Sequence, residues 1–391
     1  MKTHWLRLLA LLILTSLALP SYAEVYVSNQ YPVPPGTDSV PANPPTIGKS
    51  ASAVAAIPTA PAITVYATDS VGNAAPLRTI SGPATGLMYP SGIAVDEVHH
   101  EIYVADFFGQ AIHVFDLSAN GNVAPLRTLI NGPNSHIAQP RTVVVDIAND
   151  EIIVISFNDG IRSFPRTASG DATPLRTISG AATLLDNPPT VVLDSAHGEL
   201  IASSGRAGGA GIPGILIFDR NADGDVAPLR IIAGSQTQTG AHIGHVALDP
   251  VHDEIIIPGQ SGTSILAFPR AGNGNIAPLR QMTDSSVALS HPIFAVDTVN
   301  DRLLVAIDGR HELRAYPRTA TGPTAALMAL AGPATGLYEP TDVAIDSAGG
   351  LNGLGGFAAT PVTTVPALTP WSLGALALLL AGLTLIRLRR S

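Results

Sequence analysis

The chain has 391 residues, with 37 glycines, 33 prolines, no cysteine and only 13% charged residues. The 46% hydrophobic content excludes an extended disordered chain, and the lack of cysteine excludes disulfides, zinc–thiolate sites and thiol nucleophiles. Between the terminal segments, 16 basic residues stand against 30 acidic ones, which disfavours nucleic acid as a partner. We expect a turn-rich globular β protein.

Residues 1–23 are laid out like a secretory signal peptide. A basic start precedes an apolar core at residues 8–19, and small residues precede the expected cleavage between Ala23 and Glu24. The apolar core is too short to span a membrane comfortably, so a retained membrane anchor is the less favoured alternative. We therefore expect signal peptidase to act on the chain and the body to be exported.

Two short sequence motifs recur along the chain with a period of roughly 50 residues. Pro-Leu-Arg occurs five times, with a degraded sixth copy at Leu327–Met328, and apolar-x-apolar-Asp occurs six times. Each unit is predicted to form four short strands separated by Gly, Asn and Asp. In the second unit the expected strands are 92–96, 101–105, 111–115 and 124–129.

Four strands in a unit of this length are typical of a β-propeller blade. The segments Pro90–Asp96 (PSGIAVD) and Ile102–Asp106 (IYVAD) resemble NHL-type blades. We therefore expect an all-β, six-bladed β-propeller over residues 24–346. The last unit stops after its first strand, whereas Glu24–Ser28 matches a second-strand word. The ring is predicted to close by pairing the C-terminal strand with the N-terminal ones, which removes open edges.

Two segments do not follow the repeat. A Pro-rich insertion is expected at residues 29–62, inside the first unit, and a Gly/Ala/Thr linker at 347–364. The insertion joins a second strand to a third strand. In a propeller it then shares a face with the loops that lead into first strands.

The segment 365–391 combines a Pro-containing word, an apolar run at 373–386 and a basic tail. It resembles the IPTL-CTERM sorting signals of Gram-negative bacteria through Pro366, Leu368 and Trp371, although Val365 departs from the pattern. The resemblance implies a transmembrane helix and a C-terminal sorting enzyme as a partner. The protein would then lie in the inner membrane facing the periplasm, or on the cell surface after processing; a plain C-terminal anchor is the alternative.

Two motifs have metal-ligand residue types but fit turns better. Asp219–Gly224 matches the start of an EF-hand calcium loop. The twelfth position of such a loop requires a carboxylate ligand, but here that position is Arg230. The Asp-x-x-His-x-Glu motif alternates with Asn copies in other units, and Asn exchanges with His more easily in a turn than as a metal ligand. We interpret both as hairpins between strands. The histidine copies are His99, His197 and His252.

Other histidines lie in loops that lead into first strands and so converge on the mouth of the central channel. Propeller lactonases and lyases hold metal ions at that place, which makes His242, His245 and His291 candidate metal ligands. Solvated loop histidines are the alternative. We assign no catalytic residue and expect no cofactor other than such a metal.

The arginines of the Pro-Leu-Arg motifs fall on the outermost strands. Because they recur in five units, we expect them to stabilise the blades through ion pairs or stacking. On the mouth face, aromatic side chains are candidate ligand contacts: Tyr89, Phe107, Phe108 and Tyr338. The leading hypothesis is an exported, envelope-anchored, non-enzymatic binding or scaffold module for a protein or glycan. The alternative is a metal-dependent lactonase- or lyase-like enzyme.

Overall fold

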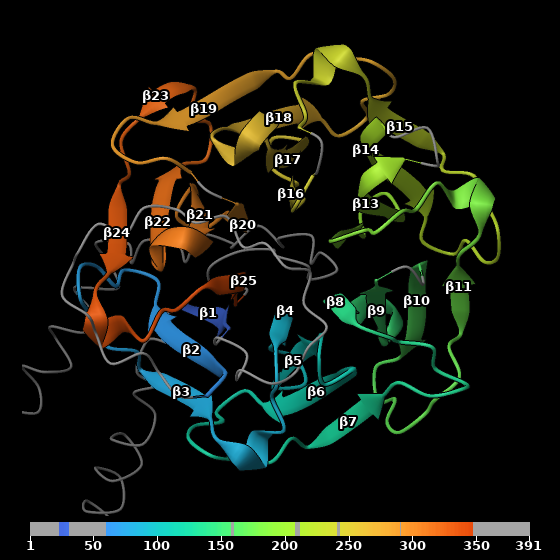
Figure 1. Cartoon of the computed structure of the whole chain (residues 1–391), viewed down its shortest axis with the longest axis vertical. Coiled ribbons are helices and arrows are strands. Elements are labelled where there is room, and N and C mark those ends of the chain that lie inside the picture. The colour runs from blue at the N-terminus through green and yellow to red at the C-terminus, as the bar shows by residue number, and fades with distance from the viewer. Residues whose placement is uncertain are drawn as a thin grey trace, which may run out of the picture. The chain divides into compact units, whose positions relative to one another are not determined.

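The computed structural model describes residues 23–30, 60–157, 160–207, 212–240, 243–289 and 291–346. The expected signal peptide up to residue 22, most of the Pro-rich insertion, the linker and the sorting segment lie outside these residues. Six sheets surround a central axis (Figure 1), which confirms the all-β, six-bladed propeller. Within the described residues, none of the helices has the length and apolar character needed to cross a membrane.

Five blades are built from strands that follow one another in the chain, with the first strand innermost and the last outermost (Figure 1). Blade 2 contains β4 (Pro90–Asp96), β5 (Glu101–Asp106), β6 (Ala111–Asp116) and β7 (Arg127–Ile130). Blade 3 contains β8 (Pro140–Asp146), β9 (Glu151–Ser156), β10 (Gly160–Pro165) and β11 (Arg176–Ile178). Blade 4 contains β12 (Val191–Asp194), β13 (Glu199–Ala207), β14 (Ile212–Asp219) and β15 (Arg230–Ala233).

Blade 5 contains β16 (Ala247–Asp249), β17 (Glu254–Pro258), β18 (Ile265–Pro269) and β19 (Arg280–Asp284). Blade 6 contains β20 (Pro292–Asp297), β21 (Arg302–Ile307), β22 (Glu312–Pro317) and β24 (Met328–Ala331). Short 3₁₀ turns lie between strands: η1 (Pro83–Thr85), η2 (Ile147–Asn149), η3 (Ala181–Thr183), η4 (Ser235–Thr237), η5 (Gln260–Gly262), η6 (Asp308–Arg310) and η7 (Pro333–Thr335).

Blade 1 combines both ends of the repeat region. β25 (Pro340–Ile345) pairs with β1 (Glu24–Asn29), followed by β2 (Ala62–Ala67) and β3 (Arg78–Ser81). In the antiparallel register Val25 lies opposite Ile345 and Val27 lies opposite Val343. The predicted closure is therefore confirmed, and the two strands that flank the Pro-rich insertion reach into it as far as Asn29 and Ala62.

The outermost strands start later than predicted. In blade 2 the ladder begins at Arg127 rather than at Ala124. Pro125 has no N–H to donate to a ladder, and the Leu126 side chain is 59% exposed. The Pro-Leu pair therefore leads into the strand, and only the Leu126 N–H bonds back to Val114.

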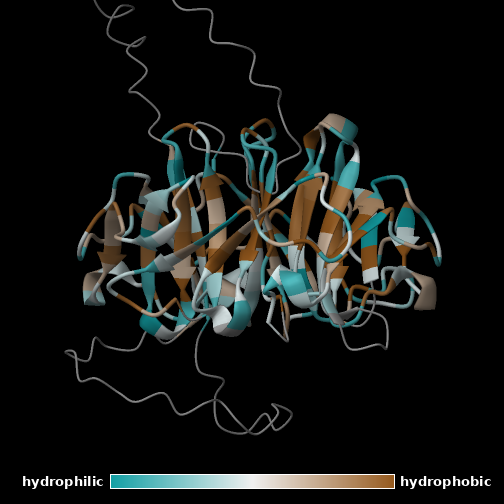
Figure 2. Cartoon of the chain, turned by 90° about the horizontal axis from the view of Figure 1, so that it is seen from above, coloured by the Kyte–Doolittle hydropathy of each residue, from teal (hydrophilic) through white to brown (hydrophobic). Residues whose placement is uncertain are grey.

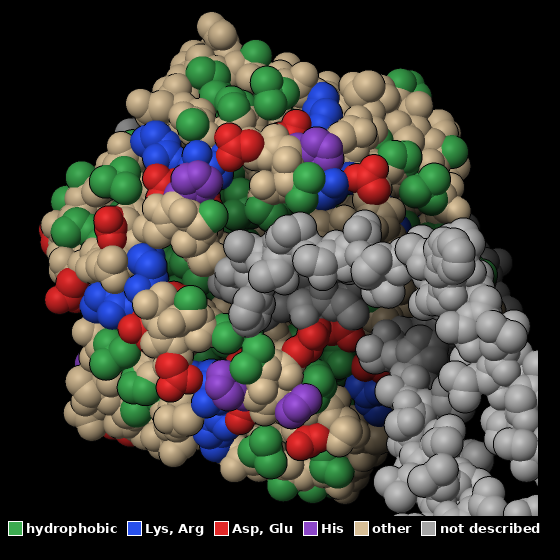
Figure 3. Space-filling model, turned by 180° about the vertical axis from the view of Figure 1, so that it is seen from behind, with side chains coloured by type: hydrophobic (Ala, Val, Ile, Leu, Met, Phe, Trp, Pro, Cys, Tyr) green, Lys and Arg blue, Asp and Glu red, His purple; other side chains and the backbone are tan. Residues whose placement is uncertain are grey.

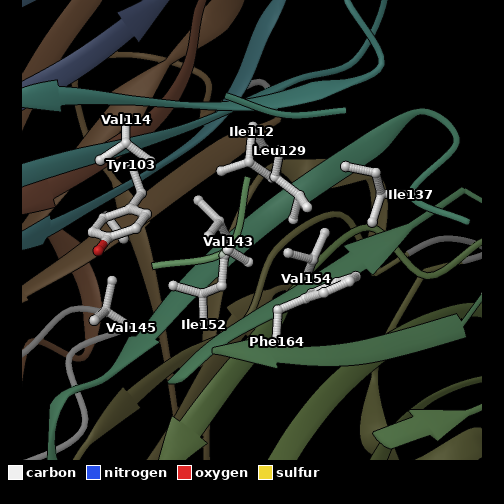
Figure 4. Close-up of a cluster of buried hydrophobic side chains, with 13 residues drawn as sticks. Tyr103, Ile112, Val114, Leu129, Ile137, Val143, Val145, Ile152, Val154 and Phe164 are labelled. Atoms are coloured by element: carbon white, nitrogen blue, oxygen red, sulfur yellow. The ribbon is translucent and has the colours of Figure 1, made fainter. Parts of the chain in front are cut away.

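The hydrophobic core lies between neighbouring blades. Figure 4 shows apolar side chains of blades 2 and 3 packed against one another. Both faces of each sheet are covered by neighbouring blades, so the inner strands are nearly continuous apolar runs. Figure 2 shows hydrophobic residues (brown) along the strands and more hydrophilic residues (teal) in the loops. The cluster between these blades includes Tyr103, Ile112, Val114, Leu129, Val143, Ile152, Val154 and Phe164.

The hairpin between the third and fourth strands connects each blade to the preceding one. In blade 6 this hairpin forms β23 (Gly322–Thr324), which pairs in parallel with β19. At each such connection the glycine has φ between 62° and 87° and a Cβ atom would meet nothing within 4 Å, so backbone conformation, not space, requires glycine. The equivalent single bridges are Gly72–Leu330, Ile80–Gly121, Leu129–Gly170, Ile178–Gly224 and Ile232–Gly274.

This geometry confirms the turn interpretation of the calcium-like motif. Asp219 accepts a hydrogen bond from the N–H of Asn221 at 2.7 Å. Asp223 accepts one from the N–H of Thr177 in the preceding blade at 2.8 Å. Both carboxylates therefore already have structural partners.

The Asp-x-x-His motif is likewise a hairpin. His99 Nδ1 lies 2.7 Å from Asp96, and His252 Nδ1 lies 2.8 Å from Asp249. Asn149 makes the same contact with Asp146 at 2.9 Å. The side chain at this position closes the turn, whether it is His or Asn.

The repeated arginines form the predicted ion pairs. Glu101 accepts hydrogen bonds from Arg127 of its own blade, from Tyr103 and, at 2.8 Å, from Arg166 of blade 3. Each such glutamate therefore connects neighbouring strands. Figure 3 shows that basic, acidic and histidine side chains lie side by side around this face. The five pairs are Arg78–Glu24, Arg127–Glu101, Arg176–Glu151, Arg230–Glu199 and Arg280–Glu254.

Candidate ligand-binding site

A cavity of about 710 Å³ lies at the mouth of the central channel. It is lined by loops between second and third strands, by loops leading into first strands, and by the starts of the first strands. These two loop sets share one face, as predicted, and the volume suits a small ligand. All six blades contribute, for example through Thr341, Phe107, Arg141, Thr190, His245 and Asp308.

The first strands of blades 1 to 3 enter the cavity through β-bulges, which re-aim side chains. In blade 2 the register shifts between Pro90 and Gly92, and the bulged Ser91 donates a hydrogen bond to the carbonyl of Pro140 at 2.8 Å. Thr341 makes the equivalent bond to the carbonyl of Pro90 at 2.6 Å. In these two blades the bulged residue therefore fastens one blade to the next.

Arg141 occupies the same bulge in blade 3. There the next residue, Thr142, makes the inter-blade bond, to the carbonyl of Pro189 at 3.1 Å. The guanidinium of Arg141 instead lines the cavity, with its carbon 5.4 Å from the centre of the Phe107 ring and 4.8 Å from that of Phe157. Burial lowers the pKa of Arg141.

Three of the four predicted contact aromatics form one cluster. The ring centres of Tyr89 and Phe108 are 4.8 Å apart, and those of Phe107 and Phe108 are 5.1 Å apart. The buried carboxylate of Asp106 positions their loops, because it accepts hydrogen bonds from the N–H groups of Tyr89 and Gly109 at 2.8 and 2.9 Å. The aromatic wall of the cavity is therefore held by a structural carboxylate.

Tyr338 lies apart from this cluster. Its ring stacks on His311 with 4.6 Å between the ring centres, and its N–H donates to Asn29 at 3.1 Å. Tyr338 does not belong to the cavity lining. Its predicted role as a ligand contact stays a prediction.

Blade 6 brings an acidic residue, Asp308, to the cavity. Burial raises the pKa of Asp308 to about 6, and the charge of Glu339 adds to this shift while His291 opposes it. Burial, together with Asp308 and Glu339, also raises the pKa of Tyr89 to about 12. The cavity therefore has an arginine on blade 3 and a carboxyl group on blade 6.

We expect Asp308→Asn to stabilise the protein at neutral pH. The folded state binds the Asp308 proton more tightly than the unfolded chain, so the contribution of this residue to stability declines as pH rises from about 4 through about 6. The variant should gain about 3 kcal/mol near pH 8 and little near pH 4. Urea unfolding at both pH values measures this, and an equal change at both would contradict it.

His245, which also lines the cavity, faces an acidic residue from a different blade. Its Nε2 lies 3.5 Å from Asp342, although blade 6 separates their blades. Asp342 also accepts hydrogen bonds from the N–H groups of Ile93 and Val343, both at 2.9 Å. The Nδ1 atom of His245 is buried and has no hydrogen-bond partner within the described part of the chain.

The metal hypothesis stays untested. His245 and His291 both line the cavity, but His242 lies outside the described residues. Among the residues that the structure describes, no three His, Asp or Glu side chains lie close enough together to hold a metal ion.

Sequence reasoning missed Arg141, Phe157 and Asp308. One signal was available: Arg141 stands where blades 1 and 2 have the hydroxyl residues Thr341 and Ser91, so it departs from the repeat. No comparable signal marked Phe157, which joins the wall through its contact with Arg141.

No protein-family model matches the chain, and no curated protein matches it. Its structure is similar to one in a crystal structure of a nidogen/laminin complex, with a TM-score of 0.52 at 13% identity over 83% of this chain and 97% of that one. It is less similar to Kuenenia stuttgartiensis hydrazine synthase, with a TM-score of 0.46 at 13% identity over 66% of this chain and 74% of that one. It is also less similar to the WD40 β-propeller domain of Doa1, with a TM-score of 0.47 at 11% identity over 70% of this chain and 79% of that one. Together with the six sheets, the first likeness identifies the chain as an all-β, six-bladed β-propeller.

Proposed function

We propose that this protein is an exported, envelope-anchored propeller that binds a glycan or protein at the mouth cavity without changing it chemically. One observation carries the proposal: the cavity combines an aromatic wall with a half-buried arginine that forms no ion pair with any described residue. Aromatic and arginine side chains are enriched where proteins bind ligands. The NHL-type resemblance of the repeats agrees with such a role.

Export and anchoring rest on the terminal segments. Residues 1–23 would direct secretion and be removed by signal peptidase, and residues 365–391 would provide a membrane helix and the substrate of a sorting enzyme. Deleting 365–391 should release the protein into the periplasm or medium. Cell fractionation measures this, and a truncated protein that stays in the membrane fraction would contradict the anchor.

Replacing Phe107 and Phe108 with alanine tests the binding role. On an array of bacterial glycans and envelope proteins, the double variant should bind at least about tenfold more weakly than the wild type. Leu126→Ala is the control, since it removes an exposed apolar side chain away from the cavity. Mass spectrometry should recover the bound component unchanged; recovery of a cleaved or isomerised product would contradict a non-enzymatic role.

A metal-dependent lactonase- or lyase-like enzyme is the alternative. The buried, unpartnered Nδ1 of His245 favours it, since this atom lies beside the cavity with no described acceptor or donor. Stoichiometric zinc or calcium in the purified protein, lost in a His242/His245/His291 triple alanine variant, would establish this alternative. Metal-free protein that still binds its ligand would support the binding module.

A further inference from the structure

We propose that the mouth cavity recognises a single carboxylate, which pairs with the guanidinium of Arg141 while the body of the ligand lies against the aromatic wall of Phe107, Phe108 and Tyr89. This inference rests on the proposed binding function of the cavity. It adds the chemical class of the ligand.

Among the residues that the structure describes, Arg141 has no acidic partner. Twelve other arginines in the described part of the chain form ion pairs with Asp or Glu, but Arg141 is in none of them. Its Nε is buried and has no hydrogen-bond acceptor within the described ranges. Burying a cation without a partner costs free energy, and an anion in the cavity would remove that cost.

The charges around the cavity favour a carboxylate over a phosphate. Among the described residues that line it, Arg141 is the only Arg or Lys, whereas Asp308 and Asp342 are acidic. Any anion in the cavity would meet this one guanidinium and these two acidic residues. The charge of a monoanion is matched by the guanidinium, whereas the second charge of a dianion would have no counter-cation and would be repelled by the acidic residues. The planar fork of arginine also fits the two oxygens of a carboxylate.

The aromatic side chains define the rest of the ligand. Phe107 and Phe157 lie on the guanidinium and hold it in place, and Tyr89 and Phe108 extend the wall. A flat apolar surface, either an aromatic ring or the CH face of a sugar, would pack there. The volume admits a small organic acid or the acidic end of a glycan, and both share this chemistry.

Calorimetric titration of the full-length protein with benzoate and with its neutral isostere benzamide tests the proposal. Benzoate should bind at least about tenfold more tightly than benzamide. In R141Q this preference should disappear, whereas R141K should keep part of it. R310Q is the matched control, because it removes a cation of the same face that is 44% exposed and does not line the cavity. A second pair of titrations compares glucuronate with glucose. Tighter binding of benzoate would indicate a small aromatic acid as the ligand, and tighter binding of glucuronate would indicate the acidic end of a glycan.

A second readout does not depend on ligand affinity. R141Q without ligand should melt at the same temperature as the wild type or higher, because it removes an uncompensated cation, and millimolar benzoate should raise the melting temperature of the wild type only. Any one of three results would overturn the proposal. They are equal binding of both members of each acid–neutral pair, an unchanged preference for the acid in R141Q, and tighter binding of phenyl phosphate than of benzoate. Array binding that depends on Phe107 and Phe108 would still support the proposed function in that case.

Discussion

Deletion of Glu24–Asn29 should abolish cooperative folding. β1 lies between β25 and β2, so its removal leaves β25 without a partner and exposes one edge of β2, which still pairs with β3. Val25, Tyr26 and Val27 are at most 2% exposed, and each buried side chain contributes about 1.5–3 kcal/mol before the lost ladder bonds are counted. The total approaches the whole stability of a typical domain.

Circular dichroism melting and limited proteolysis measure this effect. The control replaces Glu24–Asn29 (EVYVSN) with the equivalent strand of blade 2, Glu101–Asp106 (EIYVAD), which keeps the apolar pattern and the pairing glutamate. The replacement should fold, whereas the deletion should not. An unchanged melting curve after deletion would show that the described register does not hold the ring closed.

Glu101→Gln should destabilise the protein by about 3 kcal/mol at neutral pH, because it leaves the half-buried Arg127 without its carboxylate, whereas Arg166 keeps Asp150. Burial alone would raise the pKa of Glu101, but hydrogen bonds from Arg127 and Tyr103 and the charge of Arg166 outweigh it and lower the pKa to about 2. The stabilisation is therefore fully present above about pH 4.5 and is lost as pH falls toward 2. Wild type and variant should converge in acid.

A double-mutant cycle separates the pair from its surroundings. Arg127→Met copies the sixth blade, where Met328 stands in the arginine position. Combined with Glu101→Gln, it should cost less than the sum of the single changes, because no unpaired charge remains between them. Chemical unfolding near pH 7 and near pH 3 measures the cycle. Additive effects, or an equal loss at both pH values, would contradict the ion-pair explanation.

The repeat explains why the fold was predictable from this sequence. Each blade repeats the same motifs, so the stabilising role of Arg127 and the turn at Gly224 could be recognised from their copies, although the partner Glu101 was identified only in the structure. Closure could also be predicted, because Glu24–Ser28 matches a second-strand motif. Interactions that recur in every unit leave a periodic pattern in the sequence.

The cavity was only partly predictable, because its key residues depart from the repeat. Arg141 could be found as an exception to Ser91 and Thr341, but its packing on Phe157 depends on a bulge that the sequence does not mark. The meeting of His245 with Asp342 also crosses an intervening blade. Such contacts join residues of repeat units that are not consecutive in the sequence, so the repeat period does not predict them.

The composite first blade also fixes the order of events during synthesis. Ser28 of β1 bonds Thr341, a partner 313 residues later in the chain, so at roughly 5–20 residues per second it waits about 15–60 s for that partner to be made. Blades 2 to 6 can form in the meantime from local hairpins. The last association in the ring is therefore the slowest by topology, and until it occurs the edge of β1 is open to other strands.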